Sequence, residues 1–147
     1  MRSRIGGRGS SVELAACDVA AIVVFVTIGL ISHHRGLSAG GYARDTLPLA
    51  GGWFGAAALF RAYGDAPRGR AVLATWACGV PAGVLIRALA LGRPLNGKEA
   101  AFLGVSLCMI GLLVTLLRGA LLLADGARLG PRLPALPRDA PYREERR

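Results

Sequence analysis

The charged side chains of this 147-residue sequence gather in its two tails and in three short connections, leaving long apolar runs between them. A bilayer core of about 30 Å needs about 20 consecutive, mostly apolar residues in a helix. Four segments approach that requirement, at residues 13–35, 46–63, 70–92 and 99–123, and the second has the shortest uninterrupted apolar part. The pattern predicts an all-α fold, a membrane-embedded four-helix bundle over residues 13–124.

The composition agrees with a membrane protein. Hydrophobic residues make up 53% of the chain, and its mean hydropathy is +0.46. Soluble domains are about 45–50% apolar even when glycine is counted. The excess is too large for one soluble core, so we expect most of the apolar surface to face lipid.

The first apolar run also resembles the hydrophobic part of a signal peptide. Arg2, Arg4 and Arg8 precede it, as a basic region would. However, no small-x-small cleavage pattern follows, and the run leads directly into His33 and His34. We therefore expect this run to remain as a span, with cleavage as the less favoured alternative.

The basic residues predict the orientation of the bundle, because cytoplasmic connections carry the excess of lysine and arginine. With four spans, one side holds nine basic residues near span ends: Arg2, Arg4, Arg8, Arg61, Arg68, Arg70, Arg118, Arg128 and Arg132. The other side holds four: Arg35, Arg44, Arg93 and Lys98. We therefore expect a multi-pass protein of the cell membrane with both termini in the cytoplasm. The net charge of +9 comes without a nucleic-acid-binding motif, so no nucleic acid partner is expected.

The two tails lie outside the predicted spans. Residues 1–12 form a basic N-terminal tail, and residues 125–147 form a C-terminal tail rich in proline and arginine. Gly126 can stop a helix, and the four prolines that follow prevent another from forming. We expect the C-terminal tail to be disordered. The alternative is a polyproline II segment at its PRLP and PALP units that recruits a partner.

Small residues recur at helical spacing within the predicted spans. Such residues let helices approach closely in lipid, where the hydrophobic effect does not drive helices together. On the second and third spans the pairs are Gly51 with Gly55, Gly52 with Ala56, and Gly79 with Gly83. On the fourth span the packing face is expected to hold Gly104, Cys108, Gly111, Thr115 and Arg118, with Leu112 and Leu116 toward lipid.

Ionisable residues inside the spans fall at two depths. Asp18 lies five residues into its span, or about 8 Å, whereas His33 lies at the opposite end. In antiparallel spans Asp18 shares its level with Arg61 and Tyr63, and the histidines share theirs with Asp45 and Glu99. The expected inner cluster consists of Asp18, Trp76 and Arg118, and the expected outer cluster consists of His33, Trp53 and Arg87. Asp18 and Arg87 are therefore not expected to pair.

Intramembrane charges are costly and are candidates for function. Asp18, Arg87 and Arg118 all lie near span ends, where an ion pair or snorkelling suffices, so we favour a structural role over transport or ligand binding. Adjacent histidines on a helix point about 100° apart, so His33 and His34 do not form a two-ligand metal site together. A metal site that joins one histidine to Asp45 or Glu99 is the less favoured alternative.

No catalytic or cofactor-binding signature occurs in the sequence. Cys17, Cys78 and Cys108 lack metal-binding spacing, and we expect them to be small buried residues. No metal, cofactor or enzymatic activity is expected.

The polar and small residues of the spans resemble those of the prokaryotic family known as domain of unknown function 3054. The resemblance covers about residues 14–118 and rests on these positions: Asp18, Phe25, Gly29, His33 or His34, Pro48, Gly52, Trp53, Gly83, Arg87, Phe102 and Arg118. It implies a four-span integral membrane protein of the kind found in actinobacteria and haloarchaea, with no established activity. The family pattern has Gly-Trp before the last arginine, where this chain has Leu116 and Leu117.

Two functions are compatible with these features. The first is an interaction or accessory protein of the membrane, in which ion pairs lock the bundle and the partners are the lipid bilayer and a membrane protein or second copy. The alternative is a small proton- or ion-coupled carrier that works as a homodimer, since four short helices enclose little space.

Overall fold

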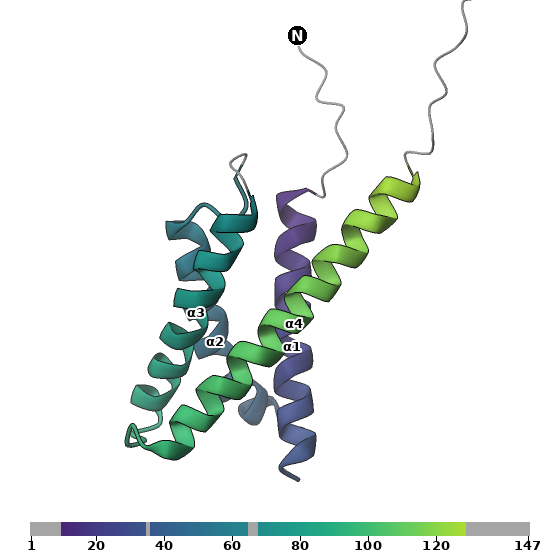
Figure 1. Cartoon of the computed structure of the whole chain (residues 1–147). Coiled ribbons are helices and arrows are strands. Elements are labelled where there is room, and N and C mark those ends of the chain that lie inside the picture. The colour runs from purple at the N-terminus through teal and green to yellow at the C-terminus, as the bar shows by residue number, and fades with distance from the viewer. Residues whose placement is uncertain (1–9, 35, 65–67, 129–147) are drawn as a thin grey trace, which may run out of the picture.

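The computed structural model describes residues 10–34, 36–64 and 68–128, which form four α-helices and no strand. The helices are α1 (Ser11–Ser32), α2 (Ala39–Leu59), α3 (Arg68–Ala90) and α4 (Gly97–Arg128). They alternate in direction, and α4 crosses the others obliquely (Figure 1). We call the end where α1 and α3 begin the Ser11 end, and the opposite end the Ser32 end. The predicted all-α helical bundle is confirmed.

Capping residues set where the first two helices begin. At α1 the Ser10 hydroxyl accepts a hydrogen bond from the backbone N–H of Glu13 (3.2 Å), and the Glu13 carboxylate accepts one from the backbone N–H of Ser10 (2.6 Å). This capping box satisfies two N–H groups that a helix start leaves unpaired. At α2 the Ser38 hydroxyl accepts from the N–H of Gly41 (3.1 Å), so α2 begins at Ala39. The sequence predicted that the second span begins near residue 46.

Among the described residues, α1, α3 and α4 are long and apolar enough to cross a membrane, whereas α2 is not. The early start of α2 explains its lower hydropathy, because its first turns contain the charged residues Arg44 and Asp45. At the other end of the chain, α4 continues through Gly126 to Arg128, so Gly126 does not stop this helix as predicted. Residues 1–9 and 129–147, which include most of both predicted tails, lie outside the described residues.

Glycine holds α2 and α3 together. A Cβ atom added to Gly52 would lie 2.5 Å from the carbonyl oxygen of Gly79 and 2.6 Å from the Cα of Gly83. By contrast, a Cβ atom on Gly51 or Gly55 would meet nothing within 4 Å. Of the two small-residue stripes predicted on the second span, the one through Gly52 therefore packs, and the one through Gly51 faces outward.

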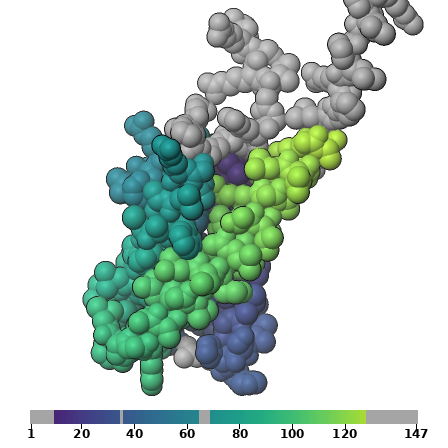
Figure 2. All heavy atoms as spheres, viewed as in Figure 1, coloured from purple at the N-terminus to yellow at the C-terminus, as the bar shows by residue number. Residues whose placement is uncertain are grey.

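The face of α4 that packs differs from the predicted one. Ser106, Ile110, Val114 and Arg118 are buried, and the two apolar members join a core built from all four helices. The wholly buried centre of that core includes these residues: Ala21, Ile22, Leu49, Trp53, Val80 and Ile110. Of the predicted face, Arg118 is buried and Gly111 packs against Trp76, whereas Gly104, Cys108 and Thr115 are exposed, so the prediction was right at two positions and wrong at three. α4 lies obliquely across the other helices (Figures 1 and 2), and Ile110 and Val114 are its members of the buried core.

Side chains on the outer surface complete this picture. Leu112 and Leu116 point outward, as predicted, with exposed fractions of 53% and 57%. Gly104 and Thr115 are also exposed. Cys78 and Cys108 are exposed as well, which corrects the expectation that they are buried. Several of the small residues of α4, at Gly104, Cys108 and Thr115, therefore lie on its outer side.

Candidate functional site

The Asp18 carboxylate is the centre of the first polar cluster. Its side chain is fully buried and accepts four hydrogen bonds from three side chains. Arg118 donates through Nε to Oδ1 (2.8 Å) and through Nη2 to Oδ2. Trp53 donates through its indole N–H (3.0 Å) and Tyr63 through its hydroxyl (2.7 Å), both to Oδ2. We call these four residues the Asp18 cluster.

A tight turn after α2 brings Tyr63 into this cluster. Arg61 adopts a left-handed backbone conformation (φ 53°), and the N–H of Ala62 donates to the carbonyl of Ala57 (2.9 Å). This arrangement is a common way to end a helix and reverse the chain. The Ser11 hydroxyl then donates to the backbone carbonyl of Tyr63 (2.9 Å), which fixes the turn against α1.

The Asp18 cluster agrees with the depth argument at Arg118 and departs from the prediction at Trp53. Asp18 pairs with Arg118, as the depth argument predicted. Trp53, predicted in the outer cluster, instead donates to Asp18. Because α2 begins at Ala39, Trp53 lies about 21 Å along this helix, toward the Ser11 end. Arg61 shares the level of Asp18, but its side chain is exposed and makes no ion pair with it.

Trp76, predicted in the inner cluster, makes a separate contact between α3 and α4. Its indole N–H donates to the carbonyl of Leu107 (2.9 Å). A Cβ atom on Gly111 would lie 2.8 Å from the same indole nitrogen, so only glycine fits beneath the ring. Trp76 therefore does not bond to Asp18, but it fixes the position of α4 near the middle of the bundle.

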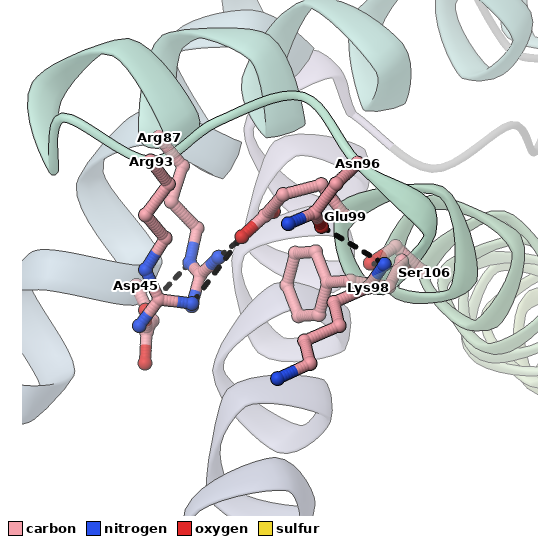
Figure 3. Close-up of polar contacts among 8 residues, drawn as sticks. Asp45, Arg87, Arg93, Asn96, Lys98, Glu99 and Ser106 are labelled. Atoms are coloured by element: carbon pink, nitrogen blue, oxygen red, sulfur yellow. Dashed lines mark hydrogen bonds and ion pairs between the residues drawn. The ribbon is translucent and has the colours of Figure 1, made fainter.

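Arg87 is the centre of the second polar cluster, at the Ser32 end (Figure 3). Its Nε donates to Asp45 Oδ1 (2.7 Å), and its Nη1 donates to Glu99 Oε2 (3.4 Å). Arg93 Nη1 donates to the other Glu99 oxygen (3.3 Å), and the Arg87 guanidinium carbon lies 4.3 Å from the ring centroid of Phe102. We call Asp45, Arg87, Arg93 and Glu99 the Arg87 cluster. It joins α2, α3 and α4.

The Arg87 cluster agrees with the depth argument. Arg87 pairs with the two acids that the sequence assigned to the outer level, and it does not pair with Asp18. The third predicted member, His33, lines the same cavity as Arg87, but its side chain makes no hydrogen bond or ion pair within the described ranges. The sequence did not predict the contribution of Arg93, which comes from a connection whose shape is not set by helical periodicity.

Two cavities flank α4 on opposite sides. The first, about 380 Å³, lies between α3 and α4 and is lined almost entirely by apolar groups, including Trp53, Trp76 and Leu107. The second, about 370 Å³, lies between α1 and α4 at the Ser32 end and is bordered by the Arg87 cluster. We call it the Arg87 cavity, and it is the only one of the two that combines charged groups with an apolar wall.

Metal ligands do not converge anywhere in the part of the chain that the structure describes. No three histidine, cysteine, aspartate or glutamate side chains come close enough together there to hold an ion. The two clusters hold helices together through ion pairs, and the Arg87 cavity presents charged groups beside an apolar wall.

A protein-family model matches residues 15–121. The chain belongs to the DUF3054 family. The family is described as "Protein of unknown function (DUF3054)", and the matched segment contains every member of the Asp18 and Arg87 clusters. Comparisons with curated proteins and with solved structures gave no match. The two clusters therefore lie within the part of the chain that the family model matches.

Proposed function

We propose that this DUF3054 protein is a non-transporting accessory protein of the plasma membrane, built as a fixed bundle. The observation that carries the proposal is the ion pair of the buried Asp18 with Arg118, in a carboxylate that accepts four hydrogen bonds from α4, α2 and the turn after α2. The Arg87 cluster joins α2, α3 and α4 in the same way at the other end. Ion pairs at both ends oppose any sliding of one helix past another.

We infer four membrane crossings from the directions of the helices. Both α1 and α3 are apolar enough to cross, and both run from the Ser11 end to the Ser32 end. The chain between them has to return across the bilayer, and α2 is the element that runs back. It packs closely through Gly52 on α3, a helix that is apolar enough to cross. The basic asymmetry of the connections favours the Ser11 end as the cytoplasmic side.

The alternative function, a proton- or ion-coupled carrier, requires a group that binds and releases its ion during turnover. A proton added to Asp18 would remove the negative charge that pairs with the buried guanidinium group of Arg118. Removing one partner from a buried ion pair costs about 3–5 kcal/mol. A carrier would have to recover that cost in each cycle, which makes Asp18 a poor coupling residue. The same geometry supports a role in stability.

An accessory function implies a partner, which we propose to be another membrane protein or a second copy of this chain within the bilayer. We also propose that the protein is not an enzyme, since the ionisable side chains of the Asp18 and Arg87 clusters are bonded to one another. Native mass measurement of the protein released from nanodiscs identifies the partner. A stoichiometric second protein supports the accessory function, and a bare dimer with measurable ion flux would contradict it.

The decisive experiment compares flux with stability in one variant. The Asp18→Asn protein and the wild type are reconstituted in liposomes, and proton flux is recorded under imposed ion gradients while thermal unfolding is measured in parallel. We expect no flux that depends on Asp18, together with a large loss of stability in the variant. Normal stability in Asp18→Asn combined with loss of a wild-type proton flux would overturn the proposal in favour of the carrier.

A further inference from the structure

The Arg87 cavity changes in chemical character along its length. At the Ser32 end it is bordered by Arg87, Arg93, Lys98 and Glu99. One to two helical turns deeper its wall is apolar and is formed by these side chains: Phe25, Val26, Leu30, Phe102 and Val105. Lys98 and Val105 are seven residues apart on α4, which corresponds to about 10 Å along the helix axis. The cavity therefore has a charged end and a separate hydrocarbon-like end.

The charges at this end do not cancel. Three cationic side chains, Arg87, Arg93 and Lys98, face two acidic ones, Asp45 and Glu99, which leaves one net positive charge. The acids are already engaged, since each accepts a hydrogen bond from an arginine. One positive charge of this lining is therefore not balanced by an acidic side chain.

Hydrogen-bond donors at this end of the cavity remain available to bind an anion. Arg87 uses Nε and Nη1 in its ion pairs, whereas its Nη2 donates to no group in the described part of the chain. Only 4% of Arg87 is exposed, so this unused donor belongs to a deeply placed side chain. The ammonium group of Lys98 also stands outside the network of ion pairs (Figure 3). His33 borders the same end of the cavity.

The apolar end opens toward lipid. Phe25 and Val26 of α1 are buried, with exposed fractions of 6% and 4%, whereas Val105 of α4 is 57% exposed. The apolar wall thus continues from inside the cavity onto the outer surface of α4. Figure 1 shows that α1 and α4 diverge toward the Ser32 end, where the cavity lies between them. A hydrocarbon chain can enter sideways from the bilayer without opening the bundle.

We propose that the Arg87 cavity binds an anionic phospholipid. Its phosphodiester, which carries a single negative charge, lies at Lys98 and the unused Arg87 donor, and one acyl chain lies against Phe25 and Val105. The volume of about 370 Å³ falls within the range of small-molecule sites, about 300–1,000 Å³. A zwitterionic lipid would bring an additional cation to an end that already has a net positive charge. This site does not depend on whether the bundle also transports ions.

Two pairs of variants test the two halves of the site. Lys98→Gln removes a cationic donor, and Lys98→Arg is its charge-conserving control. Gly29→Leu fills the apolar end, because a Cβ atom on Gly29 meets nothing within 4 Å and the residue lines the cavity. Gly51→Leu is the matched control, since Gly51 is equally open and lines neither cavity.

Binding is measured by native mass spectrometry of the full chain titrated with phosphatidylglycerol, or with phosphatidylcholine of the same acyl chains. We expect one phosphatidylglycerol per chain, bound more tightly than phosphatidylcholine. Lys98→Gln and Gly29→Leu should each lower the affinity for phosphatidylglycerol about tenfold. This is the loss expected for one charge-assisted hydrogen bond or for a filled pocket. The two control variants should bind as the wild type does.

Three outcomes would overturn the proposal. Equal affinity for the two lipids would mean that the head group is not recognised. Unchanged binding in both Gly29→Leu and Lys98→Gln would place the lipid elsewhere. Competition by millimolar inorganic phosphate that displaces the lipid completely would indicate an anion site without a role for the acyl chain. Because Lys98 is exposed and outside the ion pairs, its variants remain informative even if Gly29→Leu fails to fold.

Discussion

Asp18 and Arg118, one hundred residues apart in sequence, are joined by two hydrogen bonds between α1 and α4. The paired geometry matches the fork of a guanidinium to the two oxygens of a carboxylate. Asp18 is fully buried, and Arg118 is 8% exposed, so lipid and water are both largely excluded from the contact. This pair closes the bundle, because it ties its first helix to its last.

A double-mutant cycle tests this pairing. Asp18→Asn should lower the free energy of unfolding by about 3–5 kcal/mol, since it leaves Arg118 buried without its counter-charge. Adding Arg118→Gln should recover part of that loss. Adding Arg87→Gln should not recover any of it, because the changes in unfolding free energy at distant, independent sites add within about 0.5 kcal/mol. The measurement is unfolding in mild detergent, and strong coupling between Asp18 and Arg87 would contradict the helix arrangement described above.

Gly52 offers a test of the α2–α3 contact. Gly52→Ala places a methyl group against the backbone of Gly83, so we expect a loss of about 1–3 kcal/mol or more in the free energy of unfolding. The matched control is Gly51→Ala, next in the chain but facing open space. It should be neutral or stabilising by up to about 1 kcal/mol, as alanine favours a helix. Equal effects at the two positions would mean that α2 packs through a different face.

Arg61 tests the turn that positions Tyr63. The left-handed region costs a residue other than glycine about 1–2 kcal/mol of conformational free energy. Arg61 lies in that region, with φ 53°. Arg61→Gly should therefore keep or raise thermal stability, by up to about 1 kcal/mol. The control, Arg44→Gly, replaces an exposed residue inside α2 and should lower stability by about 1 kcal/mol. A destabilised Arg61→Gly protein would instead indicate that the arginine side chain contributes to the fold.

Labelling of single cysteines tests the orientation. In a variant without native cysteines, a cysteine at Gly69 should react with an impermeant reagent only from the cytoplasmic side. Cysteines at Gly40 and Asn96, at the Ser32 end, should react only from outside. The physical reason is retention of the more basic connections in the cytoplasm. Labelling of the Gly40 position only from the cytoplasm would reverse the orientation.

The sequence predicted those features that depend on distance along one helix. Four apolar runs gave the number of helices, and residues counted from the start of a run gave the depths of Asp18, Arg118 and Arg87. The rise per residue is the same in every α-helix, so depth follows from counting alone. The separation of the two ion-pair clusters follows directly from those depths.

Only the tertiary structure decided which faces meet and where α2 begins. Trp53 reaches Asp18 because α2 starts at Ala39, in turns too polar to be recognised as part of a span. On α4 the stripe through Ile110 and Val114 packs in the core, and Gly111 of the predicted glycine stripe packs separately, beneath Trp76. Rotation and crossing angle depend on how two surfaces fit together, and neither surface alone contains that information.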